Sequence, residues 1–177
     1  SVEAEVGGRL DVGFSTQDPT TDTIAVDLEG TPFRTDEGEL LFRPGGHGAL
    51  LRNLQAQAGD LVAVKNIDNI LPEHLRAVSV RWKKLLTGVL VEAQAQSRRL
   101  VRALREGPVD EAVLARAATL ALRLGQVVTS RRPDELAALL DRPLRVCGMV
   151  RNEGEPGGGP FWVLDEHGVP SPQIVES

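Results

Sequence analysis

The sequence lacks the features that mark membrane proteins, secreted disulfide-bonded proteins and nucleic-acid-binding proteins. No apolar run approaches the roughly 20 residues that a helix needs to cross a bilayer, and no signal-peptide pattern opens the chain. The single cysteine, Cys147, excludes an internal disulfide bond. The formal net charge of -5 argues against general binding to nucleic acid. We therefore expect a cytoplasmic protein with neither a membrane nor nucleic acid among its partners.

Signatures of several common chemistries are also missing. The three histidines, His47, His74 and His167, are scattered and have no cysteine or histidine neighbours at metal-ligand spacing. No Gly-x-Ser-x-Gly elbow and no Walker loop is present. Cys147 lies inside the apolar run 145–150, where a buried structural thiol is expected rather than a nucleophile.

The composition that remains suits one soluble globular core, with 177 residues of which 41% are hydrophobic and 25% are charged. Apolar side chains recur every three or four positions between residues 75 and 106, which predicts a long helix that ends at Gly107-Pro108. Two shorter helices are expected at 110–124 and 133–140. Four arginines of the long helix form a basic stripe that we expect to be a solvated face: Arg98, Arg99, Arg102 and Arg105.

Strand patterns lie on both sides of this helical middle. Residues 40–42 and 61–64 are predicted strands, joined by a glycine-rich loop and a helix at 49–57. The second strand is a compact apolar run, typical of a strand buried on both faces. The order strand, helix, strand predicts a parallel pair with a right-handed crossover. Further strands are expected at 9–15, 22–27, 144–150 and 161–164.

These patterns predict an α/β fold built on a mixed sheet with a helical insertion. We expect residues 1–71 to form an α/β nucleotide-binding part and residues 72–142 to form the insertion. Residues 143–177 are expected to continue the α/β part.

The glycine-rich loop is the strongest candidate for a binding site. Gly45, Gly46 and Gly48 leave no Cβ over the turn, so a ligand is able to approach the main chain closely. A branched side chain at Gly46 or Gly48 is expected to block both the backbone angles of the loop and the approach of the ligand. Asp68 and Asn69 follow the second predicted strand, where a carboxylate is able to hold Mg²⁺ on a phosphate. The alternative is that the glycines form only a tight turn and that Asp68 begins another.

Two stretches resemble the UDP-sugar pyrophosphorylases. Residues 42–50 are similar to a loop in which Pro-x-Gly-x-Gly-Gly opens a helix, and residues 65–71 are similar to a strand that ends in Asp-Asn-Ile-Leu. The chain resembles more closely a bacterial family of unknown function, which is placed by likeness among nucleotide-sugar transferases of the GT-A type. The matching stretches are FSTQDPTTDTIAVD, LFRPGGHGALLRNL, VKNIDNILP, RVCGMVRNEGEPGGGPFWV and SPQIVES.

The resemblance implies a partial GT-A or Rossmann-like sheet and a set of site residues. It implies nucleotide binding by Gly45, Gly46, His47, Gly48 and Asn69, although His47 stands where the pyrophosphorylases usually carry another residue. It gives Asp68 the catalytic and Mg²⁺-binding role. It also implies sugar binding by one loop of the last segment, through Asn152, Glu153 and Glu155.

Two other expectations from the resemblance have alternatives that the sequence leaves open. The loop that contains Glu153 has the composition of a flexible linker as well as that of a sugar site. Strands 9–15 and 22–27 are expected to pair around the loop 16–21, with Gln17 and Asp22 facing a ligand or simply forming part of a polar hairpin.

The first-strand loop of the Leu-x-Gly-Gly-x-Gly-Thr-Arg kind, which holds the triphosphate in GT-A pyrophosphorylases, has no match in residues 1–27. We therefore expect the chain to be an internal part of a larger protein and to be inactive alone. The expected reaction is transfer of a nucleotidyl group from a nucleoside triphosphate to a sugar 1-phosphate, with Mg²⁺ as cofactor. The alternative is a module that binds a nucleotide sugar or phosphate ligand without turnover. The expected partners are the nucleotide, the sugar phosphate and the rest of the larger chain.

Overall fold

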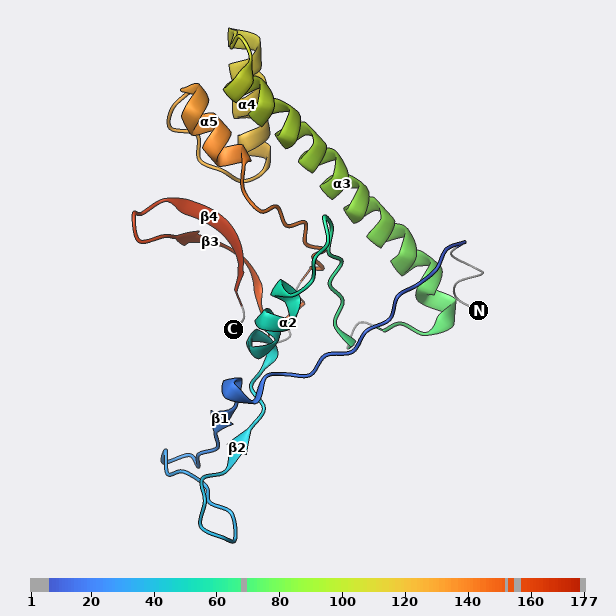
Figure 1. Ribbon diagram of the computed structural model, residues 1–177, viewed down its shortest axis with the longest axis vertical. Coiled ribbons are helices and arrows are strands. Elements are labelled where there is room, and N and C mark those ends of the chain that lie inside the picture. Colours follow the sequence, from blue (N-terminus) through green and yellow to red (C-terminus); the bar gives the residue numbers. More distant parts are fainter. Residues whose placement is uncertain (1–6, 68–69, 152, 155–156, 176–177) are drawn as a thin grey trace. The chain divides into compact units, whose positions relative to one another are not determined.

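The computed structural model describes residues 7–67, 70–151, 153–154 and 157–175. The chain divides into two compact units, Ser1–Asn69 and Ile70–Ser177, and each is considered by itself (Figure 1). The described strands form two antiparallel sheets of two strands each, so helices and small sheets are mixed in one chain.

The first unit is built around the antiparallel pair of β1 (Thr23–Ile24) and β2 (Phe42–Arg43). Two isolated bridges, Val26 with Pro32 and Arg34 with Leu40, extend the pairing away from this short sheet. The chain must turn back sharply within each of these bridged segments. Asp27 stabilises the first turn, because its carboxylate accepts hydrogen bonds from the backbone N–H groups of residues 29 and 31.

Two strand predictions for the first unit are wrong. Residues 61–64 are not in a strand, and β2 pairs with β1 rather than with a parallel neighbour, so the described residues form no βαβ unit. Leu61 and Val64 are 43% and 75% exposed, because no second surface covers the apolar run. Residues 9–15 are likewise outside any strand, and Phe14 is 98% exposed. The larger mixed sheet expected from the sequence is therefore not formed by the described residues.

The structure confirms the three helices that the sequence predicts in the second unit. They are α3 (Glu73–Glu106), α4 (Glu111–Arg123) and α5 (Pro133–Leu140). Asp110 begins α4, since its carboxylate accepts a hydrogen bond of 2.8 Å from the Val113 N–H. Pro133 occupies the first turn of α5, where its missing N–H costs nothing.

The core of the second unit lies where α4 and α5 pack against the C-terminal part of α3 (Figure 1). It consists of Leu104 from α3, five residues of α4 and three residues of α5. Leu136 is fully buried in this cluster. Earlier apolar residues of α3, such as Trp82 and Val89, are more than half exposed, so helical periodicity predicted the helix correctly but not which part of it is buried.

A β-hairpin completes the second unit. Strand β3 (Gly159–Leu164) pairs along its whole length with β4 (Pro170–Val175). Asp165 holds the turn between them, because its carboxylate accepts hydrogen bonds from the N–H groups of His167 and Val169. Strand β3 confirms the expected strand at 161–164. The strand predicted at 144–150 is wrong, since these residues pair with no strand.

Gly125 follows the end of α4 and lies close to Pro172 of the hairpin. It has a φ of +75°, and the residues around it form a Schellman motif, because the N–H groups of Gly125 and Gln126 bond to the carbonyls of Leu122 and Ala121. A Cβ at this position would lie 2.6 Å from Cγ of Pro172 in β4. Glycine is therefore required both by the backbone angle and by the close approach of the hairpin.

Gly125→Ala is expected to lower the free energy of unfolding by about 1–2 kcal/mol or more, because alanine is strained at positive φ and its methyl group displaces Pro172. Gly88→Ala is the matched control. Gly88 lies inside α3 with no atom within 4 Å of an added Cβ, so alanine there is expected to stabilise the helix by roughly 0.5–1 kcal/mol. Urea unfolding followed by circular dichroism measures both effects, and equal stabilities for the two variants would contradict this account.

Within the part of the chain that the structure describes, no helix is both long and apolar enough to cross a membrane.

Candidate functional site

The glycine loop connects β2 to two short helical segments. The 3-10 helix η2 (His47–Leu50) follows Gly46 directly, and α2 (Leu51–Gln55) continues it. The helix expected at 49–57 is therefore present, but it begins and ends two residues earlier and is divided into a 3-10 and an α-helical segment. Gly45 is partly buried, whereas Gly46, His47 and Gly48 are exposed.

Gly45 is the glycine with the least room for a side chain in this loop. A Cβ at this position would lie 3.0 Å from the carbonyl oxygen of Thr21 and 3.1 Å from Cβ of Ala49. Any larger residue must therefore move the loop away from the Thr21 backbone.

Gly46 and Gly48 differ from Gly45, because no atom lies within 4 Å of a Cβ added at either position. None of the three glycines has a positive φ. The expectation that the backbone angles of the loop demand glycine is therefore wrong. The space over Gly46 and Gly48 remains open for the close approach of a ligand.

Three consecutive backbone donors of the same loop have no acceptor in the part of the chain that the structure describes. The N–H groups of Gly46, His47 and Gly48 make no hydrogen bond with any described residue. Consecutive main-chain N–H groups without a Cβ above them are a favourable surface for anionic oxygen atoms.

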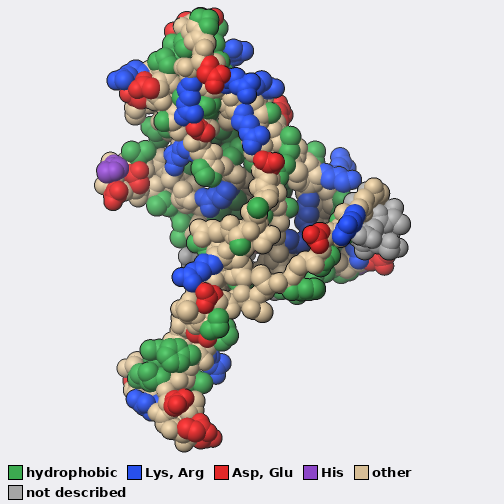
Figure 2. Space-filling view, in the orientation of Figure 1, with side chains coloured by type: hydrophobic (Ala, Val, Ile, Leu, Met, Phe, Trp, Pro, Cys, Tyr) green, Lys and Arg blue, Asp and Glu red, His purple; other side chains and the backbone are tan. Residues whose placement is uncertain are grey.

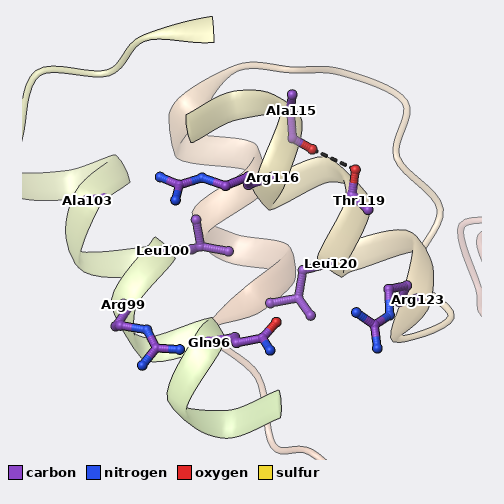
Figure 3. Close-up of a pocket in the computed structure, with 9 residues that line it drawn as sticks. All are labelled: Gln96, Arg99, Leu100, Ala103, Ala115, Arg116, Thr119, Leu120 and Arg123. Atoms are coloured by element: carbon purple, nitrogen blue, oxygen red, sulfur yellow. Dashed lines mark hydrogen bonds between the residues drawn. The ribbon is translucent and has the colours of Figure 1, made fainter. Parts of the chain in front are cut away.

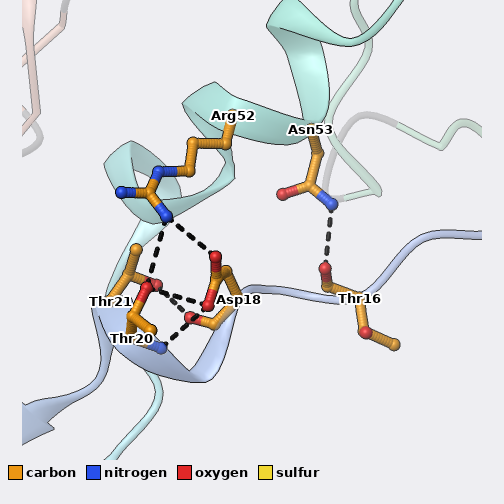
Figure 4. A network of polar contacts seen from close by, with 6 residues as sticks. All are labelled: Thr16, Asp18, Thr20, Thr21, Arg52 and Asn53. Atoms are coloured by element: carbon orange, nitrogen blue, oxygen red, sulfur yellow. Dashed lines mark hydrogen bonds and ion pairs between the residues drawn. The ribbon is translucent and has the colours of Figure 1, made fainter.

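A polar segment, residues 15–22, fixes the position of this loop and of α2 (Figure 4). Arg52 of α2 forms an ion pair of 2.8 Å with Asp18 and lies 3.3 Å from the hydroxyl of Thr20. Asn53 donates hydrogen bonds of 2.9 Å to the hydroxyl of Ser15 and to the carbonyl oxygen of Thr16. These contacts join parts of the chain that are more than 30 residues apart.

Asp18 is held in its charged form. Hydrogen bonds from the Thr20 N–H and hydroxyl, followed by the contact with Arg52, lower the pKa of this carboxyl group. Because the pKa of Asp18 is lowered in the folded state, its contacts contribute their full stability above the ordinary aspartate pKa of about 4, and that contribution is lost as the pH falls from there through the lowered pKa. The connection between the polar segment and α2 is therefore intact at neutral pH.

Gln17 and Asp22, which were expected to face a ligand, bond to each other. The Gln17 amide donates a hydrogen bond of 3.0 Å to the Asp22 carboxylate, and both side chains are partly buried. The Gln17 amide nitrogen lies 3.7 Å from the position of a Cβ on Gly45. The pair thus supports the glycine loop from the side of the polar segment.

Sequence reasoning did not identify the roles of Asp18, Arg52 and Asn53. The only local signal is the density of polar residues around the Asp18-Pro19 pair, where Asp18 caps the 3-10 helix η1 (Pro19–Thr21) through the Thr20 N–H. Nothing in the order of residues indicates that Arg52 is its partner.

Several predicted site residues lie outside the described residues: Asp68, Asn69, Asn152 and Glu155. Glu153 is described and exposed, in the second unit. Cys147 is also exposed, so the prediction of a buried thiol is wrong. Residues 144–150 are not in a sheet, so the side chain of Cys147 is not buried as it would be in a covered strand.

No group of three or more His, Cys, Asp or Glu side chains among the described residues is able to hold a metal ion. A metal held by one carboxylate together with phosphate oxygens and water does not require such a group, and Mg²⁺ commonly binds in that way.

The sequence was compared with known proteins. No curated protein and no solved structure matches the chain. A family described as "Domain of unknown function (DUF4301)" matches residues 1–177. The expectation of membership in an uncharacterised family is confirmed, and the chain belongs to the family with the domain of unknown function DUF4301.

Proposed function

We propose that this chain holds the nucleotide and the sugar in a sugar-phosphate nucleotidyltransferase of the GT-A type. The observation that carries the proposal is the geometry of the glycine loop. Its surface is open at Gly46 and Gly48, and its N–H groups bond to no described residue. Contacts with the polar segment 15–22 hold the helix that follows the loop in place. The likeness of residues 42–50 and 65–71 to the UDP-sugar pyrophosphorylases supports the same assignment.

The proposed reaction moves a nucleotidyl group. A phosphate oxygen of the sugar 1-phosphate attacks the α-phosphorus of the nucleoside triphosphate and forms a new P–O bond. The bond from the α-phosphorus to the bridging oxygen breaks, and pyrophosphate leaves with that electron pair. Catalysis of such a transfer depends mainly on positioning and on stabilisation of charge.

The glycine loop supplies the positioning of the nucleotide in this proposal. The N–H groups of Gly46, His47 and Gly48 donate hydrogen bonds to nucleotide oxygens, and the absent side chains at Gly46 and Gly48 allow that approach. Contacts of Arg52 and Asn53 with the polar segment keep the loop in place before the nucleotide arrives.

Asp68 is the residue proposed to hold Mg²⁺, with Asn69 beside it contacting the nucleotide. Bound Mg²⁺ would offset negative charge on the phosphates. One carboxylate and the phosphate oxygens form a donor set that this ion accepts.

Glu153 and Glu155 are proposed to accept hydrogen bonds from sugar hydroxyls, together with Asn152. Glu153→Gln and Glu155→Gln are each expected to raise the KM for the sugar 1-phosphate several-fold more than the KM for the nucleotide, since a neutral amide accepts hydrogen bonds more weakly than a carboxylate. Steady-state kinetics with each substrate varied in turn measures the two constants. A larger change in the KM for the nucleotide would move the sugar site elsewhere.

The proposal is tested by titrating the full-length protein, of which this chain is expected to be a part, with nucleoside triphosphates, sugar 1-phosphates and Mg²⁺ and measuring the release of pyrophosphate. Release that requires all three components supports nucleotidyl transfer. Saturable binding of a nucleotide sugar without release of pyrophosphate would replace the proposal with a non-catalytic binding module. The absence of any nucleotide binding would contradict both.

A further inference from the structure

A hollow lies between α3 and α4 in the second unit (Figure 3). Its volume is about 620 Å³, which falls in the range of roughly 300–1,000 Å³ found for small-molecule sites. The residues that line it are Gln96, Arg99, Leu100, Ala103, Ala115, Arg116, Thr119, Leu120 and Arg123.

The floor of the hollow is apolar. Leu100 of α3 and Leu120 of α4 point toward each other between the helices (Figure 3), and Leu120 is buried in the core of the unit. Ala103 and Ala115 are small, so they leave room beside the two leucines. A ligand that enters the hollow therefore meets hydrocarbon on its inner side.

Three guanidinium groups surround this floor, and no acidic side chain among the residues that line the hollow neutralises their charge. Arg99, Arg116 and Arg123 make no ion pair or side-chain hydrogen bond with any described residue, and no carboxylate lines the hollow. Other arginines of the unit are paired: Arg105 lies 2.8 Å from Asp141 and Arg131 lies 2.7 Å from Glu111. Positive charge thus gathers in the hollow without a partner among the residues that the structure describes.

The other polar groups of the hollow are already engaged as donors. The Thr119 hydroxyl donates to the Ala115 carbonyl at 2.8 Å, and the Gln96 amide donates to Glu92 at 2.9 Å. The oxygen atoms of both side chains remain available as acceptors. The free donors of the site are therefore the guanidinium groups, which need anionic oxygen atoms.

Positive charge continues along α3 beyond the hollow. A neighbouring hollow of about 420 Å³ shares Arg99 and Ala103 with it and is also lined by Arg98, Arg102 and Glu106, of which Arg102 lies 4.0 Å from the Glu106 carboxylate. Figure 2 shows Lys and Arg side chains gathered over the helices on the face in view. The stripe that was expected to be only a solvated face therefore borders a concave surface with an apolar floor.

We propose that the hollow between α3 and α4 binds a small molecule that carries two or more phosphate groups and an apolar portion. Guanidinium groups match phosphate oxygens with paired hydrogen bonds, and three unpaired arginines suit more than one phosphate. The leucine floor suits the remainder of such a ligand. This site is distinct from the proposed nucleotide loop, since its residues belong to α3 and α4 of the second unit.

Inorganic tripolyphosphate is the first probe, because it tests the phosphate contacts alone. The double variant Arg116→Gln with Arg123→Gln is expected to weaken its binding about tenfold or more in calorimetry, since both lost contacts are charge-assisted. The control is Arg76→Gln with Arg81→Gln, which removes the same charge from exposed arginines of α3 outside the hollow. The control is expected to bind within about twofold of the parent. Equal losses in both double variants would overturn the proposal, because they would show that only net charge matters.

The location of binding separates this proposal from the proposed function. Tripolyphosphate is expected to shift the side-chain Nε–H signals of Arg99, Arg116 and Arg123 in nuclear magnetic resonance spectra. A nucleoside triphosphate is expected to shift the same signals at lower concentration, because its nucleoside meets the apolar floor. Shifts confined to the glycine loop would overturn the second site while leaving the proposed function intact. Binding of an acidic amphipathic peptide at these arginines, with no response to either phosphate probe, would replace the small molecule with a protein segment.

Discussion

Replacing Asp68 with asparagine in the full-length protein is expected to lower the rate of pyrophosphate release roughly 10²- to 10³-fold, the scale of losing one strong electrostatic contact in a transition state. The substitution keeps the shape of the side chain and removes the charge proposed to hold Mg²⁺. Steady-state assays over a range of Mg²⁺ concentrations measure the effect, and the apparent affinity for Mg²⁺ is expected to fall with the rate.

Asp36→Asn is the matched control for this variant. Asp36 is an exposed carboxylate in the turn between Thr35 and Gly38, so its replacement makes the same change in net charge away from the glycine loop. Asp36→Asn is expected to leave the rate within about twofold of the parent. Undiminished turnover in Asp68→Asn, in protein shown to be folded, would remove Asp68 from the proposed site.

Replacing Gly45 with valine is expected to weaken nucleotide binding about tenfold or more, because overpacking at this point forces the loop away from its supports. The new Cβ would lie 3.0 Å from the Thr21 carbonyl oxygen and 3.1 Å from Cβ of Ala49. The loop and the Thr21 backbone would then be displaced from each other. Calorimetry gives the affinity, and amide signals of residues 16–22 report the displacement.

Gly46→Ala separates the role of the fold from the role of the open surface. A Cβ at Gly46 meets nothing within 4 Å, and the φ of −72° is ordinary for alanine. The free protein is therefore expected to keep its loop structure while nucleotide binding weakens. If Gly46→Ala binds nucleotide as the parent does, the glycines form only a turn.

The Gly45→Val variant has its own contradicting outcome. If it leaves both the loop signals and the affinity unchanged, the proposed support by residues 16–22 is wrong.

The helices were predictable from the sequence because their signals are local. Residues 75–106 carry apolar side chains at helical spacing, and Asp110 and Pro133 mark the starts of α4 and α5. Burial along α3 was less predictable, since it depends on where α4 and α5 return to cover it. The exposed Trp82 and the buried Leu104 belong to the same periodic pattern.

The strands were harder to predict, because pairing joins residues that are distant in the sequence. The apolar run 61–64 has the composition of a buried strand but no partner among the described residues. The segment that contains β1 was identified, yet it pairs with β2 rather than with residues 9–15. Composition indicates that a segment suits a strand, whereas its partner decides whether the strand forms.

The glycine loop was recognisable from its residues, but its support was not. Three glycines and a following helix indicated a candidate site, and the structure distinguishes Gly45, which packs closely against Thr21 and Ala49, from Gly46 and Gly48, which are open. The pairing of Arg52 with Asp18 crosses 34 positions in the chain. Such a contact follows from the folded arrangement rather than from any local pattern.

The most direct test of the central claim is to add a nucleoside triphosphate with Mg²⁺ to the protein and follow its backbone amide signals by nuclear magnetic resonance. The claim that the glycine loop seats the nucleotide predicts saturable shifts at Gly46, His47 and Gly48, with smaller shifts at Thr21 and Asn53, which belong to the supporting contacts. Saturable binding that leaves the three loop amides unchanged would contradict it.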